Sequence, residues 1–169
     1  QMHIMNSAGI SRFPEAQFDM VRLGISLYGV PTVEDEKDKL ENVSTLKSTI
    51  SQIKTIKKGE TVGYNRTAKA EKDMTIAIIP IGYADGLNRK LSNGKGKVYI
   101  NGIAAPIVGN ICMDMCMVDI TGMDTREGND VIIFGKEHPI AELAESEETI
   151  PYEVLTSISR RVKRVYYHE

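Results

Sequence analysis

The sequence predicts a mainly β protein in which a small barrel-like β-domain follows a short strand–helix–strand unit. Three observations predict this fold class. Short apolar runs separated by turn residues extend from Leu46 toward the C-terminus, a pattern typical of small barrels and sandwiches. The dipeptide Asn101-Gly102 separates two of these runs, and both residues tolerate the positive φ angles of a two-residue hairpin turn. Residues 2–30 instead alternate apolar and helical segments, which is the order of a βα repeat.

The N-terminal unit, residues 1–32, is interpreted as a short remnant of a (β/α) barrel of the TIM type. Its predicted elements are a buried strand over Met2–Met5, a helix over Pro14–Met20 and a second apolar strand over Val21–Tyr28. Proline is compatible with the start of a helix, because the first helical position needs no N–H donor. A single βα unit cannot bury its own faces, so we expect this unit to belong to a larger barrel.

Residues 33–169 are expected to form the β-domain, which begins with a charged linker over Val33–Lys39. Residues 46–56 fit either a bulged strand or a helical stripe, and their many Thr and Ser residues favour the strand. Further strands are predicted over Thr75–Ile81, Lys97–Ile100, Ile103–Val108, Met115–Ile120, Asp130–Phe134 and Val162–Tyr167. Helices are predicted over Ile140–Glu145 and Tyr152–Ser159.

The bulk composition is typical of a soluble globular protein and gives no reason to expect nucleic acid or membrane as a partner. The 169 residues are 41% hydrophobic and 26% charged, and 21 basic residues nearly balance 23 acidic ones for a net charge of −2. No apolar run approaches the roughly 20 residues of a transmembrane helix, and the N-terminus lacks the pattern of a signal peptide. Because no start codon encodes Gln1, we expect the chain to be an excised piece of a longer protein.

The two cysteines, Cys112 and Cys116, are predicted to be free thiols. A lone CxxxC spacing without a second Cys or His cluster is a poor zinc site, so no metal site is predicted. Neighbours on one strand rarely form a disulfide, and free thiols are usual in a reducing compartment. These observations favour a cytoplasmic protein.

Ser7, Arg22, Gly24 and Ile25 lie at the ends of the two predicted N-terminal strands. A serine hydroxyl and free backbone N–H groups suit a phosphate dianion, and in βα-barrels such groups gather in the loops after the last strands. From these residues alone, a loop serine, a turn glycine and an arginine paired with a carboxylate remain the simpler interpretation.

Six short motifs, taken in their order along the chain, resemble the C-terminal half of alanine racemase, an enzyme that uses pyridoxal phosphate (PLP). The motifs are Asn6-Ser7, Arg22–Ile25, Gly63-Tyr64, Gly82–Gly86, Cys112–Asp114 and Pro151–Glu153, and the closing stretch Ile158–Val165 is similar too. The resemblance implies an isomerase that interconverts L- and D-alanine for peptidoglycan in the bacterial cytoplasm. In that family the PLP-bearing lysine lies in the N-terminal half, which is absent from this sequence.

The resemblance implies that Tyr64 is catalytic. Racemisation removes a proton from one face of Cα and delivers a proton to the other, and the matching tyrosine is one of two bases, the PLP-bearing lysine being the second. A phenol needs nearby positive charge to act as a base near neutral pH. Taken alone, a tyrosine beside Gly63 is more simply a rim or core aromatic.

The resemblance also implies that Ser7, Arg22, Gly24 and Ile25 bind the cofactor. In alanine racemase the matching arginine donates to the pyridine nitrogen of PLP. Because arginine stays protonated, it can only donate, and the pyridine nitrogen stays unprotonated. The cofactor is then a weaker electron sink, which restrains side reactions.

Four further residues are implied to bind the substrate or to line its entrance. The backbone N–H of Met113 matches a group that binds the substrate carboxylate, and Tyr83 and Arg89 match the substrate entrance. Tyr152 matches a tyrosine that narrows the corridor and favours a small side chain. Taken singly, Tyr83 and Arg89 also fit a β-turn, and Met113 fits a side chain that fills the core. Tyr152 also fits an aromatic residue at the start of a helix. Asn110 departs from the family, where relatives often have arginine, and its lack of charge would weaken attraction of the carboxylate.

Two subunits pack head to tail in alanine racemases, so the resemblance implies a homodimer. Tyr64, Tyr83 and Met113 would reach into the partner's site, whereas the cofactor-binding residues and Tyr152 would serve their own chain. The fragment by itself is expected to be inactive. Alternatives that stay open are a non-catalytic association module and a racemase for serine or other small amino acids. A PLP-dependent amino-acid decarboxylase is disfavoured by Tyr64 followed by Gly82–Gly86.

Overall fold

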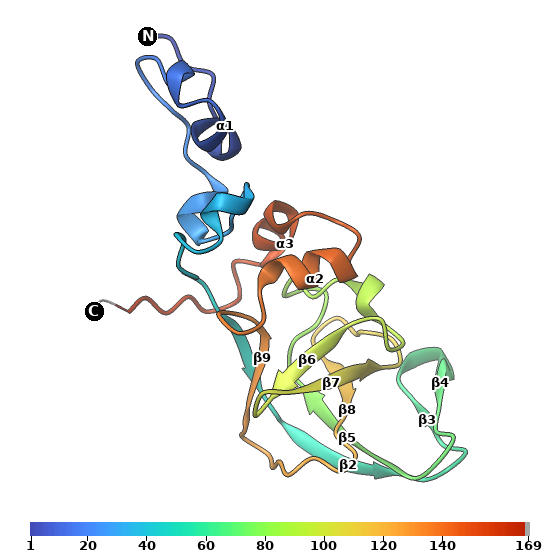
Figure 1. Cartoon of the computed structure of the whole chain (residues 1–169). Coiled ribbons are helices and arrows are strands. Elements are labelled where there is room, and N and C mark those ends of the chain that lie inside the picture. Colours follow the sequence, from blue (N-terminus) through green and yellow to red (C-terminus); the bar gives the residue numbers. More distant parts are fainter. Residues whose placement is uncertain (168–169) are drawn as a thin grey trace.

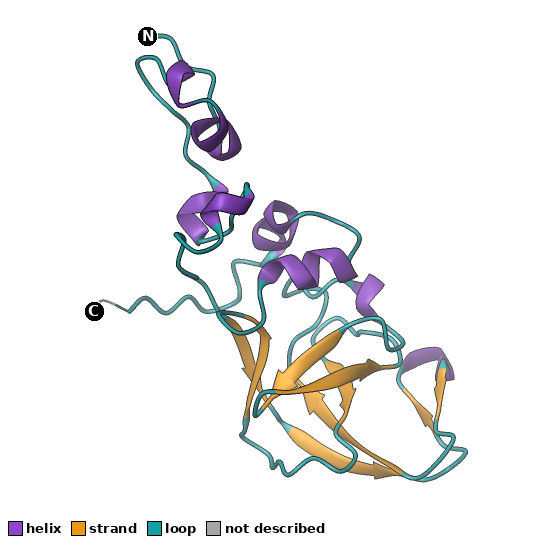
Figure 2. Cartoon of the chain, in the orientation of Figure 1, coloured by secondary structure: helices purple, strands orange, loops and turns teal. Residues whose placement is uncertain are grey.

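The structure is a computed structural model and describes residues 1–167. Its body is a curled antiparallel sheet, the longer helices gather at one end of this sheet, and the N-terminal segment extends away from it (Figures 1 and 2). We call residues 1–32 the arm and residues 33–167 the β-domain. The mainly β class predicted from the sequence is confirmed.

The main sheet has seven strands in the order β1-β9-β6-β7-β8-β5-β2. Their bounds are Leu46–Thr49 (β1), Gln52–Ile56 (β2), Met74–Ile79 (β5), Lys97–Ile100 (β6), Ile103–Val108 (β7), Cys116–Asp119 (β8) and Asp130–Phe134 (β9). A separate ribbon pairs β3 (Thr61–Val62) with β4 (Ala68–Lys69). Each strand predicted between residues 75 and 134 is therefore present, with ends that differ from the prediction by at most two residues.

One bent segment supplies both edges of the main sheet. Residues 46–56 were predicted as a single bulged strand, and they form β1, which pairs with β9, and β2, which pairs with β5. At the bend the N–H of Ile50 donates to the carbonyl of Asn129 at 3.0 Å, and the N–H of Ser51 donates to the carbonyl of Ile78 at 2.9 Å. Because the two edge strands are consecutive in the chain, the sheet curls back on itself.

The hairpin between β6 and β7 confirms the turn predicted at Asn101-Gly102. Both residues have positive φ, 51° and 75°, as a type I′ turn requires. Ile100 then pairs with Ile103 across the turn. Alternate residues of the strands face the interior, and the buried set includes Val98, Ile100, Ala105, Ile107, Val118, Val131 and Ile133.

The two predicted C-terminal helices are confirmed as α2 (Ile140–Ser146) and α3 (Pro151–Ser157). Leu143 and Ala144 of α2 and Val154 of α3 join the same core as the strands. Short 3₁₀ turns occur at Glu34–Glu36 (η3), Tyr64–Arg66 (η4) and Arg89–Leu91 (η5). None of the helices within residues 1–167 is long and apolar enough to cross a bilayer.

The arm differs from its predicted strand–helix–strand pattern. Its helix is α1 (Ser7–Arg12), which lies earlier than the predicted Pro14–Met20 because the side chain of Asn6 caps it by accepting the Gly9 N–H at 2.9 Å. The later region holds only the 3₁₀ turns η1 (Pro14–Ala16) and η2 (Ile25–Tyr28).

The two segments predicted as strands of the arm run side by side without forming regular strands. The N–H of Asp19 donates to the carbonyl of Met2 at 3.2 Å, and the N–H of Arg22 donates to the carbonyl of Met5 at 2.8 Å. A parallel sheet needs covering helices on both faces and neighbouring strands, which this stretch of chain does not provide.

The strand predicted over Val162–Tyr167 is wrong. Arg164 donates to the carbonyls of Ile158 at 2.9 Å, Val162 at 2.8 Å and Ser159, so residues 158–164 fold into a loop. These three bonds use local acceptors, and residues 165–167 are exposed and outside the sheet. The predicted strand is thus a loop that the side chain of Arg164 holds together.

Candidate active site

Four predicted site residues meet where the arm contacts the start of α3. The N–H of Gly24 donates to Oγ of Ser7 at 2.9 Å, and the N–H of Ile25 lies 3.4 Å from Oη of Tyr152. A Cβ added to Gly24 would lie 3.6 Å from that phenol oxygen and 3.7 Å from the serine oxygen. Gly24 therefore lies between the two hydroxyls, and these four residues form the first cluster.

Local sequence accounts for how the first cluster is built. Ser7 is buried and begins α1 directly after the capping residue Asn6. Pro151 occupies the first turn of α3, where its missing N–H does no harm. Tyr152 follows it, and buried Val154 anchors the same helix to the core. The hydroxyls of Ser7 and Tyr152 are thus held by two helix starts that are distant in the sequence.

The donors of the first cluster fit a phosphate group. A phosphate dianion binds hydroxyls and backbone N–H groups, and the cluster offers both kinds from Ser7, Gly24, Ile25 and Tyr152. Arg22, the remaining residue predicted to bind the cofactor, is exposed and its Nη2 donates to the carbonyl of Ile4 at 3.0 Å. The structure therefore brings together all predicted members of this set except Arg22.

A second cluster forms where the turn at residues 82–86 lies against the loop at residues 112–114. The N–H of Tyr83 donates to the carbonyl of Cys112 at 3.1 Å, and the N–H of Ala84 donates to the carbonyl of Met113 at 3.0 Å. A Cβ on Gly82 would lie 2.4 Å from both of these carbonyl oxygens, so only glycine permits the contact. The side chains of Tyr83 and Met113 remain exposed.

Tyr64 lies on η4, with a side chain that is 74% exposed. Gly63, just before it, has a φ of +76°, and a Cβ there would lie 3.2 Å from Cε of Met117 and 3.6 Å from the N of Asn110. Asn110 in turn accepts a hydrogen bond at Oδ1 from Asn93 at 3.1 Å. The turn that carries Tyr64 therefore packs against Asn110, which lies two residues before Cys112 in the sequence.

Arg89 is exposed at the start of η5, where the side chain of Asn88 accepts the N–H of Lys90 at 3.0 Å. Burial raises the pKa of the Cys112 thiol, and the charge of Arg89 opposes that rise. The charge of Arg89 therefore acts on the thiol of Cys112, which belongs to the second cluster. Burial also raises the pKa of Cys116 to about 12, so neither thiol has thiolate character near neutral pH.

Both cysteines are free, as predicted from their spacing. Over the described part of the chain, His, Cys, Asp and Glu side chains form no group of three that could hold a metal ion.

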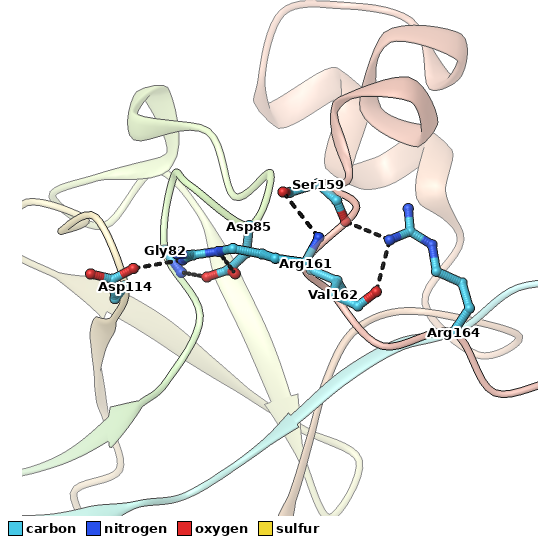
Figure 3. A network of polar contacts seen from close by, with 7 residues as sticks. All are labelled: Gly82, Asp85, Asp114, Ser159, Arg161, Val162 and Arg164. Carbon is cyan, nitrogen blue, oxygen red and sulfur yellow. Dashed lines mark hydrogen bonds and ion pairs between the residues drawn. The ribbon is translucent and has the colours of Figure 1, made fainter.

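Three residues that link the two segments of the second cluster received no role from the sequence. Arg161 bridges Asp85 and Asp114, one from each loop (Figure 3). Both acidic residues lie inside recognised motifs and Arg161 lies in the closing stretch. Nothing in their spacing connects positions so far apart, so only the fold reveals the pairing.

Comparison with known proteins matches almost the whole chain to one family. Residues 43–166 match the alanine racemase C-terminal domain, and residues 1–32 match the alanine racemase N-terminal domain. The chain is 47% identical to alanine racemase 1 of Clostridium acetobutylicum and 48% identical to the alanine racemase of Clostridium novyi, in each case over 97% of this chain and 44% of the relative. The chain therefore spans less than half the length of these curated relatives.

Solved structures give the same result. The alanine racemase from D-cycloserine-producing Streptomyces lavendulae superposes with a TM-score of 0.91 at 32% identity, over 99% of this chain and 46% of that one. The alanine racemase from Bartonella henselae, whose structure has covalently bound pyridoxal phosphate, gives 0.88 at 40% identity, over 98% and 46%. On the sequence motifs, the fold and these matches, the chain belongs to the alanine racemase family.

Proposed function

We propose that this chain is the C-terminal part of a PLP-dependent alanine racemase that interconverts L- and D-alanine for peptidoglycan in the bacterial cytoplasm. Residues 1–32 would complete the PLP-binding barrel, and residues 33–169 would be the C-terminal β-domain. The observation that carries the proposal is the first cluster, in which residues 7, 24, 25 and 152 converge with the donors that a phosphate requires. Identities of 47% and 48% to alanine racemases support it.

The first cluster would hold the phosphate of the cofactor. Ser7 would donate its hydroxyl, and Gly24 and Ile25 would donate their N–H groups, in place of the bonds that now join them to each other and to Tyr152. Arg22 would donate to the pyridine nitrogen in place of the Ile4 carbonyl. When bound, the cofactor withdraws electrons from the substrate and makes the proton on Cα acidic.

Tyr64 would exchange a proton with Cα from one face through its phenol oxygen. The base on the opposite face would be the lysine that carries the cofactor, from the N-terminal half of the partner subunit in a head-to-tail homodimer. The high exposure of Tyr64 in this chain, 74%, agrees with a side chain that completes a site on another subunit. Two bases on opposite faces are what inversion at Cα demands.

The substrate would be bound by the second cluster. The N–H of Met113 would bind the carboxylate of alanine, and Tyr83 and Arg89 would line the entrance. Tyr152 would narrow the corridor from the first cluster, where it is held beside Ile25. A narrow corridor favours a methyl side chain, and substrate profiling with alanine and serine in the complete enzyme tests this specificity.

Replacing Tyr64 by phenylalanine in the complete enzyme tests the catalytic proposal. We expect racemisation to fall by about 10²–10⁴-fold, the usual contribution of a positioned acid or base. The remaining base should still exchange the α-proton of one enantiomer with deuterium from solvent, without inversion. Tyr166→Phe, in the exposed C-terminal segment, is the matched control. Full racemase turnover by the Tyr64→Phe enzyme would refute the role of Tyr64.

The isolated chain is predicted to be inactive, because the second base lies outside it. Incubation of the chain with PLP and L-alanine should yield no D-alanine, and clear D-alanine production would contradict the prediction. A non-catalytic association module is the second candidate, favoured by exposed apolar side chains along the arm such as Ile4, Phe18 and Leu27. Sedimentation distinguishes the candidates, since a strictly monomeric chain at high concentration would exclude the module.

A further inference from the structure

Arg161 joins the two loops of the second cluster through one guanidinium group. Its Nε donates to Oδ1 of Asp85 at 2.7 Å, and its Nη2 donates to Oδ1 of Asp114 at 2.6 Å (Figure 3). Asp85 belongs to the turn that carries Tyr83, and Asp114 directly follows Met113. One side chain therefore spans the two segments that would bind the substrate.

Asp85 accepts two further hydrogen bonds besides the one from Arg161. Its other carboxylate oxygen, Oδ2, accepts the N–H of Gly82 at 2.8 Å, and its backbone carbonyl accepts the N–H of Ser159 at 3.0 Å. Its side chain is only 14% exposed. The turn is thus bound to itself, to the loop after α3 and, through Arg161, to the loop that carries Met113.

The loop that presents Arg161 is itself held by a second arginine. Arg164 donates to the carbonyls of Ile158 at 2.9 Å and Val162 at 2.8 Å, and also to Ser159. Ser157 adds a bond from its hydroxyl to the carbonyl of Gly86 at 3.3 Å. These contacts fix the backbone on both sides of Arg161, so its guanidinium is aimed before any substrate arrives.

The exposure of the bridge indicates that its main effect is on geometry and not on stability. The side chains of Arg161 and Asp114 are 46% and 57% exposed, and ion pairs at such positions contribute little to folding. A guanidinium, however, presents several donors in one rigid plane and can hold two carboxylates at a fixed separation, which a lysine ammonium on a flexible stem cannot. Small shifts of a binding group have large effects on turnover.

We propose that Arg161 is a positioning residue that holds the Tyr83 turn against the Met113 loop, so that the N–H of Met113 and the ring of Tyr83 keep the geometry for binding the amino-acid carboxylate. The proposal rests on the function proposed above. It predicts that loss of Arg161 weakens substrate binding while the chain stays folded.

Two measurements on Arg161→Ala test the proposal. In the isolated chain, hydrogen exchange of the Tyr83 and Ala84 amides should accelerate about tenfold or more, because these N–H groups bond the Cys112 and Met113 carbonyls. In the complete enzyme, kcat/KM for alanine should fall about 10–100-fold, mostly through KM. Arg160→Ala, the exposed neighbour, should change neither value.

Two further variants keep the test independent of folding. Arg161→Lys retains one charge and should recover part of the loss, and Asp114→Asn removes only the exposed arm of the bridge and should raise KM less than Arg161→Ala. Unchanged amide exchange, or unchanged KM despite faster exchange, would overturn the positioning role. If the unmodified complete enzyme fails to racemise alanine, the proposed function fails, whereas the exchange measurement still decides whether Arg161 holds the loops.

Discussion

The arm and the β-domain have similar apolar character but bury it very differently. In the β-domain, strands and helices share one core that includes Ile79, Ile107 and Val118. In the arm, only a few side chains such as Met5 and Ile25 are buried, whereas Ile4, Phe18 and Leu27 are exposed. The difference teaches that the β-domain contains the partners for its own strands, whereas many apolar side chains of the arm have no packing partner within the described residues.

The same substitution in the two regions is expected to have the largest difference in effect. Ile100 in β6 is 1% exposed and Ile4 in the arm is 66% exposed. Ile100→Ala should lower the free energy of unfolding by about 2–5 kcal/mol, because it leaves a cavity in the core. Ile4→Ala should change it by less than about 0.5 kcal/mol. Urea unfolding of both variants measures the contrast, and equal losses would show that the arm is folded as firmly as the β-domain.

The junction between the two regions is expected to be intermediate in sensitivity. Gly29 has a φ of +73°, and a Cβ there would lie 1.8 Å from the carbonyl oxygen of Glu41. Gly29→Ala should therefore destabilise the protein by about 1–3 kcal/mol through strain and overlap. Gly94→Ala is the matched control, because Gly94 also has positive φ but has open space around it, and it should lose only about 1 kcal/mol. Thermal unfolding that treats both variants alike would show that the junction is loosely packed.

The smallest expected effect concerns the pH dependence of stability. Burial raises the pKa of Glu147, with Glu153 adding to the rise and Asn88 and Lys90 opposing it. The folded state therefore binds this proton more tightly than the unfolded state. The contribution of Glu147 is most favourable below its ordinary pKa and decreases as pH rises through its raised value.

Glu147→Gln tests this sign. The variant should lose the decline in stability over the interval from about pH 4.5 upward, and it should gain stability relative to the parent near neutral pH. Glu15→Gln, in the exposed part of the arm, should leave the pH profile unchanged. Urea unfolding at several pH values provides the measurement, and a parent profile that rises where a decline is expected would refute it.

The β-domain could be predicted from the sequence because its signals are local. The turn at Asn101-Gly102 and the apolar run at β5 each specify an element without knowledge of distant partners, and the Thr and Ser residues of 46–56 favour strand over helix. The sequence did not reveal that 46–56 bends to supply both edges of the sheet. The prediction for the arm failed because its elements depend on distant partners: the predicted strands require neighbouring strands that residues 1–32 do not contain.

The candidate site likewise contains residues that the sequence predicted and residues that only the fold reveals. The four residues of the first cluster were predicted from the family resemblance and are brought together, whereas Arg22, predicted with them, lies outside the cluster. The placement of Tyr64 on the partner's site, by contrast, stays a prediction. Arg161 could not be found from the sequence, because its two acidic partners lie 76 and 47 residues away and no local pattern links them.

The bend at Ile50-Ser51 has a consequence for how the protein resists aggregation. Because consecutive strands form both edges, the free backbone edges are only four and five residues long, and they carry Lys47 and Lys54. Short, lysine-bearing edges are poor templates for strands from other molecules. Edge-to-edge strand pairing between the β-domains of two molecules is thereby disfavoured.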